Sequence, residues 1–197
     1  MLDYEKKFQN LVIAGIDEAG RGPLAGPVVC ACVVMPFEKE KMIEQVNDSK
    51  QLSSKKREKL YDEIVKVALD YAIIEIDEKT IDEINILNAT KLGMKRALES
   101  LKIKPDIVLI DAVKIDSNIR QENIIKGDTL SYNIAAASIL AKVYRDRLMI
   151  KLSEKYPQYN FAKHKGYGTR EHINALKIYG KCPIHRESFI KNFISSN

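Results

Sequence analysis

The sequence predicts an α/β protein of one domain, because apolar strands alternate with amphipathic helices along its 197 residues. An apolar strand begins at Leu11 and ends in two adjacent carboxylates, Asp17 and Glu18. Sites in α/β sheets lie at the carboxyl ends of strands, so this pair marks the candidate site. Two acids at one strand end repel each other, and a hard divalent cation held by several oxygen atoms would relieve that repulsion.

The composition is that of an ordinary globular protein, with 45% hydrophobic and 30% charged residues. No apolar run approaches the length of a membrane span, and the first residues lack the apolar core of a secretory signal. Three cysteines without a regular spacing agree with a reducing compartment. We therefore expect a cytoplasmic protein that has no membrane partner.

The basic excess of the chain lies in its last part. From Lys155 onward there are eight Lys and Arg residues and two acids, against 24 and 25 in the residues before. Tyrosines and phenylalanines alternate with these bases, which is typical of a surface that binds phosphates and stacks on bases or sugars. A solvated helical face with a few core aromatics explains the same composition equally well.

The other elements are predicted from periodicity and from turn residues. Cys30 and Cys32 fall on one face of a strand paired with the first as a hairpin, and we expect them to be core residues. Thr80 and Glu83 form a predicted capping box at the start of a helix. The expected strands cover residues 27–35, 71–76 and 106–111, with a short one at 124–125, and the expected helices cover residues 55–69, 80–101, 128–153 and 169–178.

Two further acids are placed like the first pair. Asp111 ends a continuously apolar strand, and Asp128 lies in the first turn of the longest predicted helix. Helix capping alone would explain Asp128. If the strands that end at Asp17 and Asp111 are parallel neighbours, as strand-helix-strand crossovers favour, their carboxylates meet at one sheet edge. Together with Glu18, these acids form an all-oxygen group suited to Mg²⁺ or Mn²⁺.

Five blocks of the sequence together resemble bacterial ribonuclease HII. In chain order they are Gly15 to Val28, Asp48 to Ser53, Ile110-Asp111, Lys126 to Asp128 leading into the alanine-rich run 134–143, and His164 to Thr169. The resemblance implies a ribonuclease H-like fold, with a mixed sheet flanked by helices and a helical carboxyl-terminal extension. It implies a catalytic core over residues 1–154, a basic region over 155–197 that packs on the core and contacts substrate, and a monomer.

The resemblance also implies an activity. Such an enzyme hydrolyses the RNA strand of RNA/DNA hybrids and cuts on the 5′ side of single ribonucleotides embedded in duplex DNA, leaving 3′-hydroxyl and 5′-phosphate ends. Two Mn²⁺ or Mg²⁺ ions would serve as cofactors, with Asp17 as the bridging ligand and Glu18, Asp111 and Asp128 completing the set.

The same family pattern implies that Gly20, Arg21 and Gly22 read the ribose, aided by Tyr167. Glycines let backbone groups approach a sugar 2′-hydroxyl, and an arginine can hold a phosphate. A tight hairpin turn would need the same glycines, and spacing alone leaves Tyr167 as either a stacking surface or a core residue.

Weaker candidates and alternatives complete the predictions. Lys50 and Lys165 are candidate phosphate contacts, although most exposed lysines are simply solvated. Cys182 and His185 have a ligand-like spacing without a second pair, so we interpret them as structural and assign no catalytic role to any histidine. The stretch from Gly15 to Gly22 superficially resembles the phosphate-binding loop of an NTPase. Arg21 and Gly22, however, stand where that loop has Lys and Ser or Thr, so we do not expect an NTPase. A non-catalytic nucleic-acid-binding module remains an alternative.

Overall fold

The computed structural model describes residues 2–46, 52–111 and 113–194 and confirms a mixed sheet flanked by helices. Strand β1 is antiparallel to β2 and parallel to β4, and the strand order across the sheet is β3-β2-β1-β4-β5. The strands are β1 (Ile13–Ala19), β2 (Val28–Val34), β3 (Asp70–Ile76), β4 (Ile107–Asp111) and β5 (Arg120–Ile124). The predicted hairpin and the predicted parallel neighbours are thus both present.

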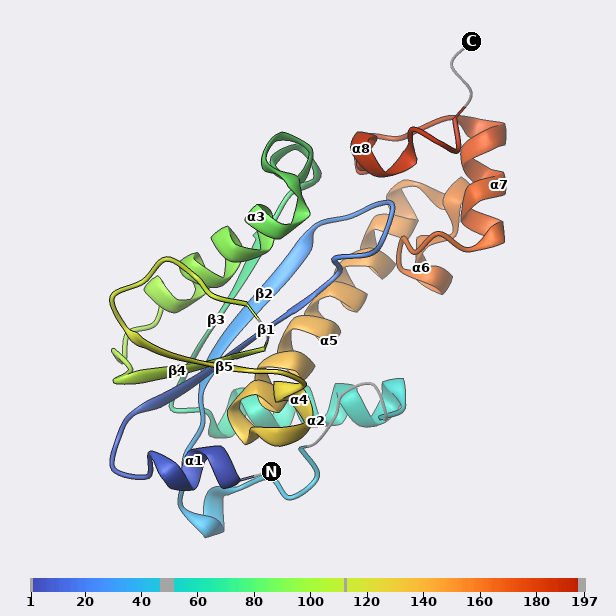
Figure 1. The fold of residues 1–197 in the computed structure, drawn as a ribbon. Coiled ribbons are helices and arrows are strands. Elements are labelled where there is room, and N and C mark those ends of the chain that lie inside the picture. Colours follow the sequence, from blue (N-terminus) through green and yellow to red (C-terminus); the bar gives the residue numbers. More distant parts are fainter. Residues whose placement is uncertain (1, 47–51, 112, 195–197) are drawn as a thin grey trace.

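Helices cover both faces of this sheet (Figure 1), with α3 on one side and α2 and α5 on the other. The shorter helices α6, α7 and α8 lie beyond the end of the sheet at which the β1–β2 connection turns. The helices are α1 (Asp3–Lys7), η1 (Lys39–Lys41), α2 (Ser54–Val67), α3 (Glu78–Glu99), α4 (Gly127–Leu130), α5 (Tyr132–Lys155), η2 (Pro157–Tyr159), α6 (Phe161–His164), α7 (Arg170–Tyr179) and α8 (Glu187–Ile190). Over the described ranges, no helix is both long and apolar enough to cross a membrane.

Two apolar layers follow from the alternation of side chains along the strands. Cys30 and Cys32 are buried on the α3 side, which confirms the prediction that they are core residues. On the other side, α5 packs directly on β1, because a Cβ added to Gly15 would lie 2.2 Å from the carbonyl carbon of Asn133. The alanine-rich part of α5 therefore approaches the sheet closely.

The prediction of one helix over residues 128–153 is wrong, because the chain breaks at Ser131. Its backbone is extended, with φ −120° and ψ 131°, and α4 and α5 are separate helices. The Ser131 hydroxyl accepts a hydrogen bond from the Ile134 amide at 3.2 Å and donates one to Glu5 at 2.6 Å. Ser131 is therefore the N-cap of α5. The alanine-rich pattern that follows it does not reveal where this helix begins.

The predicted capping box at Thr80 is also wrong. Helix α3 begins earlier, and Asp77 is its N-cap, with a side chain that accepts a hydrogen bond from the Thr80 amide at 2.8 Å. Leu87 is 43% exposed, because the backbone of Asn85 leaves the helical conformation and rotates the face of the helix. Met94 and Leu98, beyond this kink, are buried.

The carboxyl-terminal helices pack on the β1–β2 connection. Leu24 and Ala25 of this connection share an apolar cluster with Phe161 of α6, Leu176 of α7 and Ile190 of α8. Helix α5 ends at Lys155, which coincides with the predicted boundary of the basic region. The role of that region in substrate contact stays a prediction.

Candidate active site

Asp17 and Asp111 lie at the same level of the sheet. Strands β1 and β4 run parallel, and Ile16 pairs with Ile110, so the next residues along each strand are the two acids. Strand alternation directs both side chains to the face that α5 covers. Glu18 follows Asp17, and its amide donates a 2.8 Å hydrogen bond to the Asp17 carboxylate.

Burial and like charge raise the pKa of this pair. Asp17 is only 6% exposed, and burial raises the pKa of its carboxyl well above the usual range, with the charge of Glu18 adding to the effect and a hydrogen bond from Ser138 opposing it. Burial also raises the pKa of Glu18, whereas Arg21, 3.4 Å away, lowers it and Asp111 raises it. Removal of these carboxyl groups from water is therefore the main cause of both shifts, and repulsion between the acids adds to it.

Asp128 follows a residue that contacts Asp111, but it does not line the cavity that the other three acids share. The Gly127 amide donates a 3.1 Å hydrogen bond to the Asp111 carboxylate, and Asp128 is the next residue. Its side chain is 3% exposed and lies in the first turn of α4, where a capping role is also available. The structure brings three of the four predicted acids to one cavity, and the fourth stands beside it.

The cavity has a volume of about 230 Å³ and is lined by residues from β1, α2, β4 and α5 and from the loop after α6. Three polar residues of this lining are not among the predicted site residues: Arg57 of α2, and Ser138 and Lys142 of α5. Ser138 and Lys142 are one helical turn apart within the alanine-rich run, so a polar pair on an otherwise apolar helix face was the available signal. Lys142 also forms a 2.8 Å ion pair with Asp146.

The predicted ribose-reading residues meet at the rim of this cavity. Gly20 and Tyr167 both line it, and a Cβ added to Gly22 would lie 3.9 Å from the Tyr167 ring. The ring is 42% exposed, and the charged ends of Lys142 and Arg145 are each 5.9 Å from its centroid. Tyr167 is thus an exposed ring on a cation-lined rim, which resolves the alternative of a core residue.

The two predicted lysine contacts have different outcomes. Lys50 lies outside the described residues. The Lys165 ammonium donates a hydrogen bond to the Ala162 carbonyl, and its side chain does not line the acidic cavity. A phosphate contact by either lysine stays a prediction.

The donor set fits a hard divalent cation in kind, since Asp17, Glu18 and Asp111 present only carboxylate oxygens to one cavity. Within the described ranges, however, no three His, Cys, Asp or Glu side chains converge closely enough to hold one ion. The carboxylates lie at the ends of the neighbouring strands β1 and β4, but by themselves they do not form a complete coordination shell.

The three histidines form a buried cluster beneath Tyr167. The His172 Nδ1–H donates to the Tyr167 carbonyl at 3.0 Å, so its Nε2 accepts the Nε2–H of His185, also at 3.0 Å. The His185 Nδ1 accepts the Cys182 amide at 2.9 Å. These bonds define one neutral tautomer for His172 and one for His185, and burial lowers the pKa of both rings to about 4. Cys182 and His185 are thus buried and hydrogen-bonded, in agreement with a structural role.

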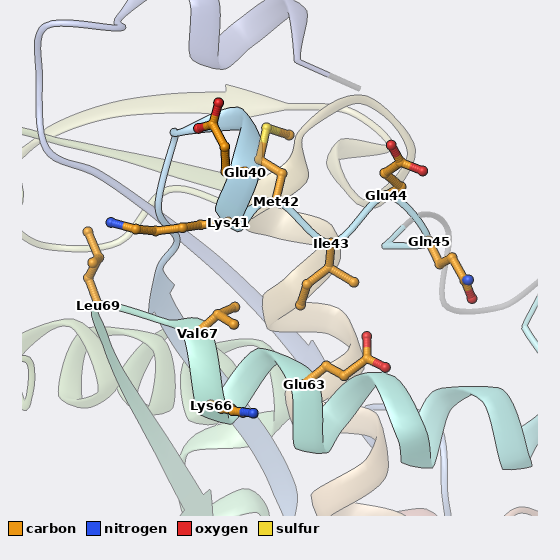
Figure 2. Close-up of a pocket in the computed structure, with 10 residues that line it drawn as sticks. All are labelled: Glu40, Lys41, Met42, Ile43, Glu44, Gln45, Glu63, Lys66, Val67 and Leu69. Atoms are coloured by element: carbon orange, nitrogen blue, oxygen red, sulfur yellow. The ribbon is translucent and has the colours of Figure 1, made fainter.

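A larger hollow, of about 800 Å³, lies away from the acids. Figure 2 shows that it is bounded by residues 40–45 on one side and by the carboxyl-terminal end of α2 on the other, with Ile43 and Val67 pointing into the same space. Its lining mixes apolar side chains with acids and lysines and includes none of the four predicted acids. The chemistry of the molecule is therefore assigned to the smaller cavity.

A five-stranded mixed sheet of this order, with α5 packed on the central strand and acids at the ends of β1 and β4, defines a ribonuclease H-like protein. The structure is similar to that of ribonuclease H2 from Pyrococcus horikoshii, with a TM-score of 0.77 and 32% identity over 92% of this chain and 96% of that one. It is also similar to RNase HII from Archaeoglobus fulgidus, solved in complex with PCNA, with a TM-score of 0.79 and 28% identity over 94% and 98%.

The sequence comparisons identify the family. The model of the family described as Ribonuclease HII matches residues 14–192. Ribonuclease HII of Caldicellulosiruptor bescii is 60% identical over 98% of this chain and 95% of its own length, and that of Ruminiclostridium cellulolyticum is 61% identical over 98% and 77%. The chain belongs to the ribonuclease HII family and is a ribonuclease H, a hydrolase.

Proposed function

We propose that the protein is an endonuclease that hydrolyses the RNA strand of RNA/DNA hybrids and cuts on the 5′ side of single ribonucleotides in duplex DNA. The observation that carries the proposal is one cavity lined both by the acids Asp17, Glu18 and Asp111 and by the rim residues Gly20 and Tyr167. Family membership supports the reaction class, and the rim supports a sugar-reading function beside the acids. The products would carry 3′-hydroxyl and 5′-phosphate ends.

In this proposal the four acids hold two divalent ions, Mn²⁺ or Mg²⁺. When bound, such ions supply an activated water and stabilise the charge on the reacting phosphate. Asp17, the most buried of the three acids in the cavity, would be the ligand shared by the two ions, and Glu18, Asp111 and Asp128 would supply further carboxylate oxygens. Asp111 is oriented for this by the Gly127 amide.

The residues of the rim and the remaining residues of the cavity bind the substrate. Gly20, Arg21 and Gly22 present backbone groups to the 2′-hydroxyl, which can both donate and accept a hydrogen bond. The Tyr167 ring packs against the sugar, and Arg57 and Lys142 attract the phosphates on either side. The basic region after Lys155 grips the duplex in the monomer.

Cleavage of an end-labelled DNA duplex with one ribonucleotide tests the proposal, beside an all-DNA duplex and with Mg²⁺, Mn²⁺ or a chelator. We expect a metal-dependent nick on the 5′ side of the ribonucleotide, lost in Asp17→Asn. Asp116→Asn is the matched control, because the Asp116 side chain is 93% exposed and pairs with Lys95 at the surface. Binding without a nick under any metal would favour a non-catalytic nucleic-acid-binding module.

A second test addresses the sugar reading. Tyr167→Ala and Tyr167→Phe should weaken cleavage at a single ribonucleotide, the first more strongly because it removes the ring as well as the hydroxyl. Tyr179→Phe is the control, since Tyr179 is 57% exposed and does not line the acidic cavity. Unchanged cleavage in both Tyr167 variants would contradict this role.

A further inference from the structure

Two completely buried arginines bind backbone carbonyls of the β1–β2 connection. Arg186, from the carboxyl-terminal region, donates to the Gly20 carbonyl at 2.6 Å and to the Arg21 carbonyl at 2.9 Å. It also donates twice to the Gly26 carbonyl, at 2.9 Å from Nε and 2.7 Å from the guanidinium end. One side chain thus joins both ends of the turn that carries the predicted ribose-reading glycines.

Arg145 of α5 performs a related task from the other side. Its guanidinium donates to the carbonyls of Ala25 at 3.1 Å and Pro27 at 3.0 Å, and to that of Lys165 at 3.0 Å. Lys165 precedes Tyr167 by two residues, so Arg145 ties the turn to the loop that carries the tyrosine. Both halves of the rim are therefore held by these two guanidinium groups.

Burying two guanidinium groups costs free energy, and a need to hold these carbonyl groups in place explains that cost. Across the residues that the structure describes, neither guanidinium lies within ion-pair distance of a carboxylate. Burial lowers the pKa of Arg186 to about 9, and the charge of Arg145 adds to this effect. Apolar side chains of similar volume would fill the same space without desolvating two positive charges. The planar five-donor fork of arginine is instead matched to several carbonyl oxygens at once.

The first glycine of the turn, Gly20, has no room for a side chain. Gly20 has φ +97°, and a Cβ there would lie 2.0 Å from the Arg145 Nε. The glycine and the arginine thus occupy complementary space, and the backbone of Gly20 is held in a conformation that other residues rarely adopt. Such over-determination is typical of backbone held for recognition.

We propose that Arg186 and Arg145 are positioning residues that fix the spacing between the Gly20–Gly22 backbone and Tyr167, and so set the affinity for the ribose of the substrate. The inference rests on the proposed function of this rim. Neither arginine touches the substrate, and both act through the carbonyl groups that they bind.

Steady-state nicking of the single-ribonucleotide duplex at saturating Mn²⁺ tests this inference. Arg186→Met should raise KM about tenfold, because the loss is one of binding, and Arg186→Lys should raise it less because it keeps a cation with fewer, less directed donors. Leu176→Ala is the matched control. Leu176 is buried in the apolar cluster that packs on the turn, and among the described contacts it forms no hydrogen bond with the turn. Truncation of its side chain should therefore lower kcat in proportion to the folded fraction and leave KM unchanged.

The folded fraction of each variant is measured by circular dichroism. A KM for Arg186→Met within about threefold of wild type overturns the inference, whatever happens to kcat. If Arg186→Met does not fold, Arg186→Lys and Arg145→Lys decide by the same threshold. A wild-type protein that nicks no ribonucleotide duplex would instead refute the proposed function, so the two failures are distinguishable.

Discussion

Acidification should destabilise the protein through His172 and His185. Burial lowers the pKa of both rings from the ordinary 6.5 to about 4, and the charge of His164 contributes at His172. Below pH 6.5 the unfolded chain takes up protons at these two positions, whereas the folded chain does not until about pH 4. The free energy of unfolding should therefore fall progressively through this window and be independent of the two histidines above it.

The size of the effect follows from proton linkage. At about pH 5, a shift from 6.5 to about 4 corresponds to about 2 kcal/mol for each histidine. Partial solvent screening reduces this to about 1–2 kcal/mol, so the pair contributes about 2–4 kcal/mol. That loss is a large part of the roughly 5–15 kcal/mol by which a domain is stable.

Urea unfolding at about pH 7 and about pH 5 measures this loss for wild type and for the double variant His172→Asn/His185→Asn. Asparagine at 172 can still donate to the Tyr167 carbonyl, and asparagine at 185 can still accept the Cys182 amide, so the fold is retained without a titrating ring. The wild type should lose about 2–4 kcal/mol more than the double variant. Equal losses in the two proteins would refute the reasoning.

Two other substitutions have expected outcomes. With chelator present, Asp17→Asn should raise the melting temperature, because it removes a buried charge that Glu18 repels, and a lower melting temperature would contradict this. With Mn²⁺ or Mg²⁺ in place of the chelator, the same substitution should abolish nicking. Gly20→Ala should lower the free energy of unfolding by about 2–3 kcal/mol, because it adds a clash with Arg145 to the strain of a positive φ. Gly180→Ala is its control, because Gly180 has φ +72° and ψ −162° with open space around the added Cβ; it should cost only the backbone strain, about 1–2 kcal/mol, in the same urea titration.

The strand-end acids were predictable because their placement depends on local pattern and on one general rule. Apolar runs ending at Asp17 and Asp111, joined through helices, predict parallel neighbours, and the register confirms that their ends coincide. The position of Asp128 was less accessible. It depends on the break at Ser131, whose partner Glu5 lies 126 residues away.

The buried polar groups were not predictable from the sequence. An arginine in a basic tail is expected to be solvated, and the partners of Arg186 are carbonyl groups, which every residue carries. The histidines at 164, 172 and 185 have no ligand-like or helical spacing, and they meet because the loops between them fold back. Long-range backbone contacts leave no signature in residue type, whereas strands and helices leave a periodic one.

The bond between Arg186 and Gly20 also orders the events of synthesis. The two residues are 166 positions apart in the chain. At about 5–20 residues per second, a ribosome needs roughly 10–30 s to add the second after the first. The sheet and its acids can form on the emerging chain during that interval, but the turn lacks its anchor until the arginine leaves the ribosome. A nascent chain can therefore bring its acidic strand ends together before the turn proposed to recognise a sugar is anchored.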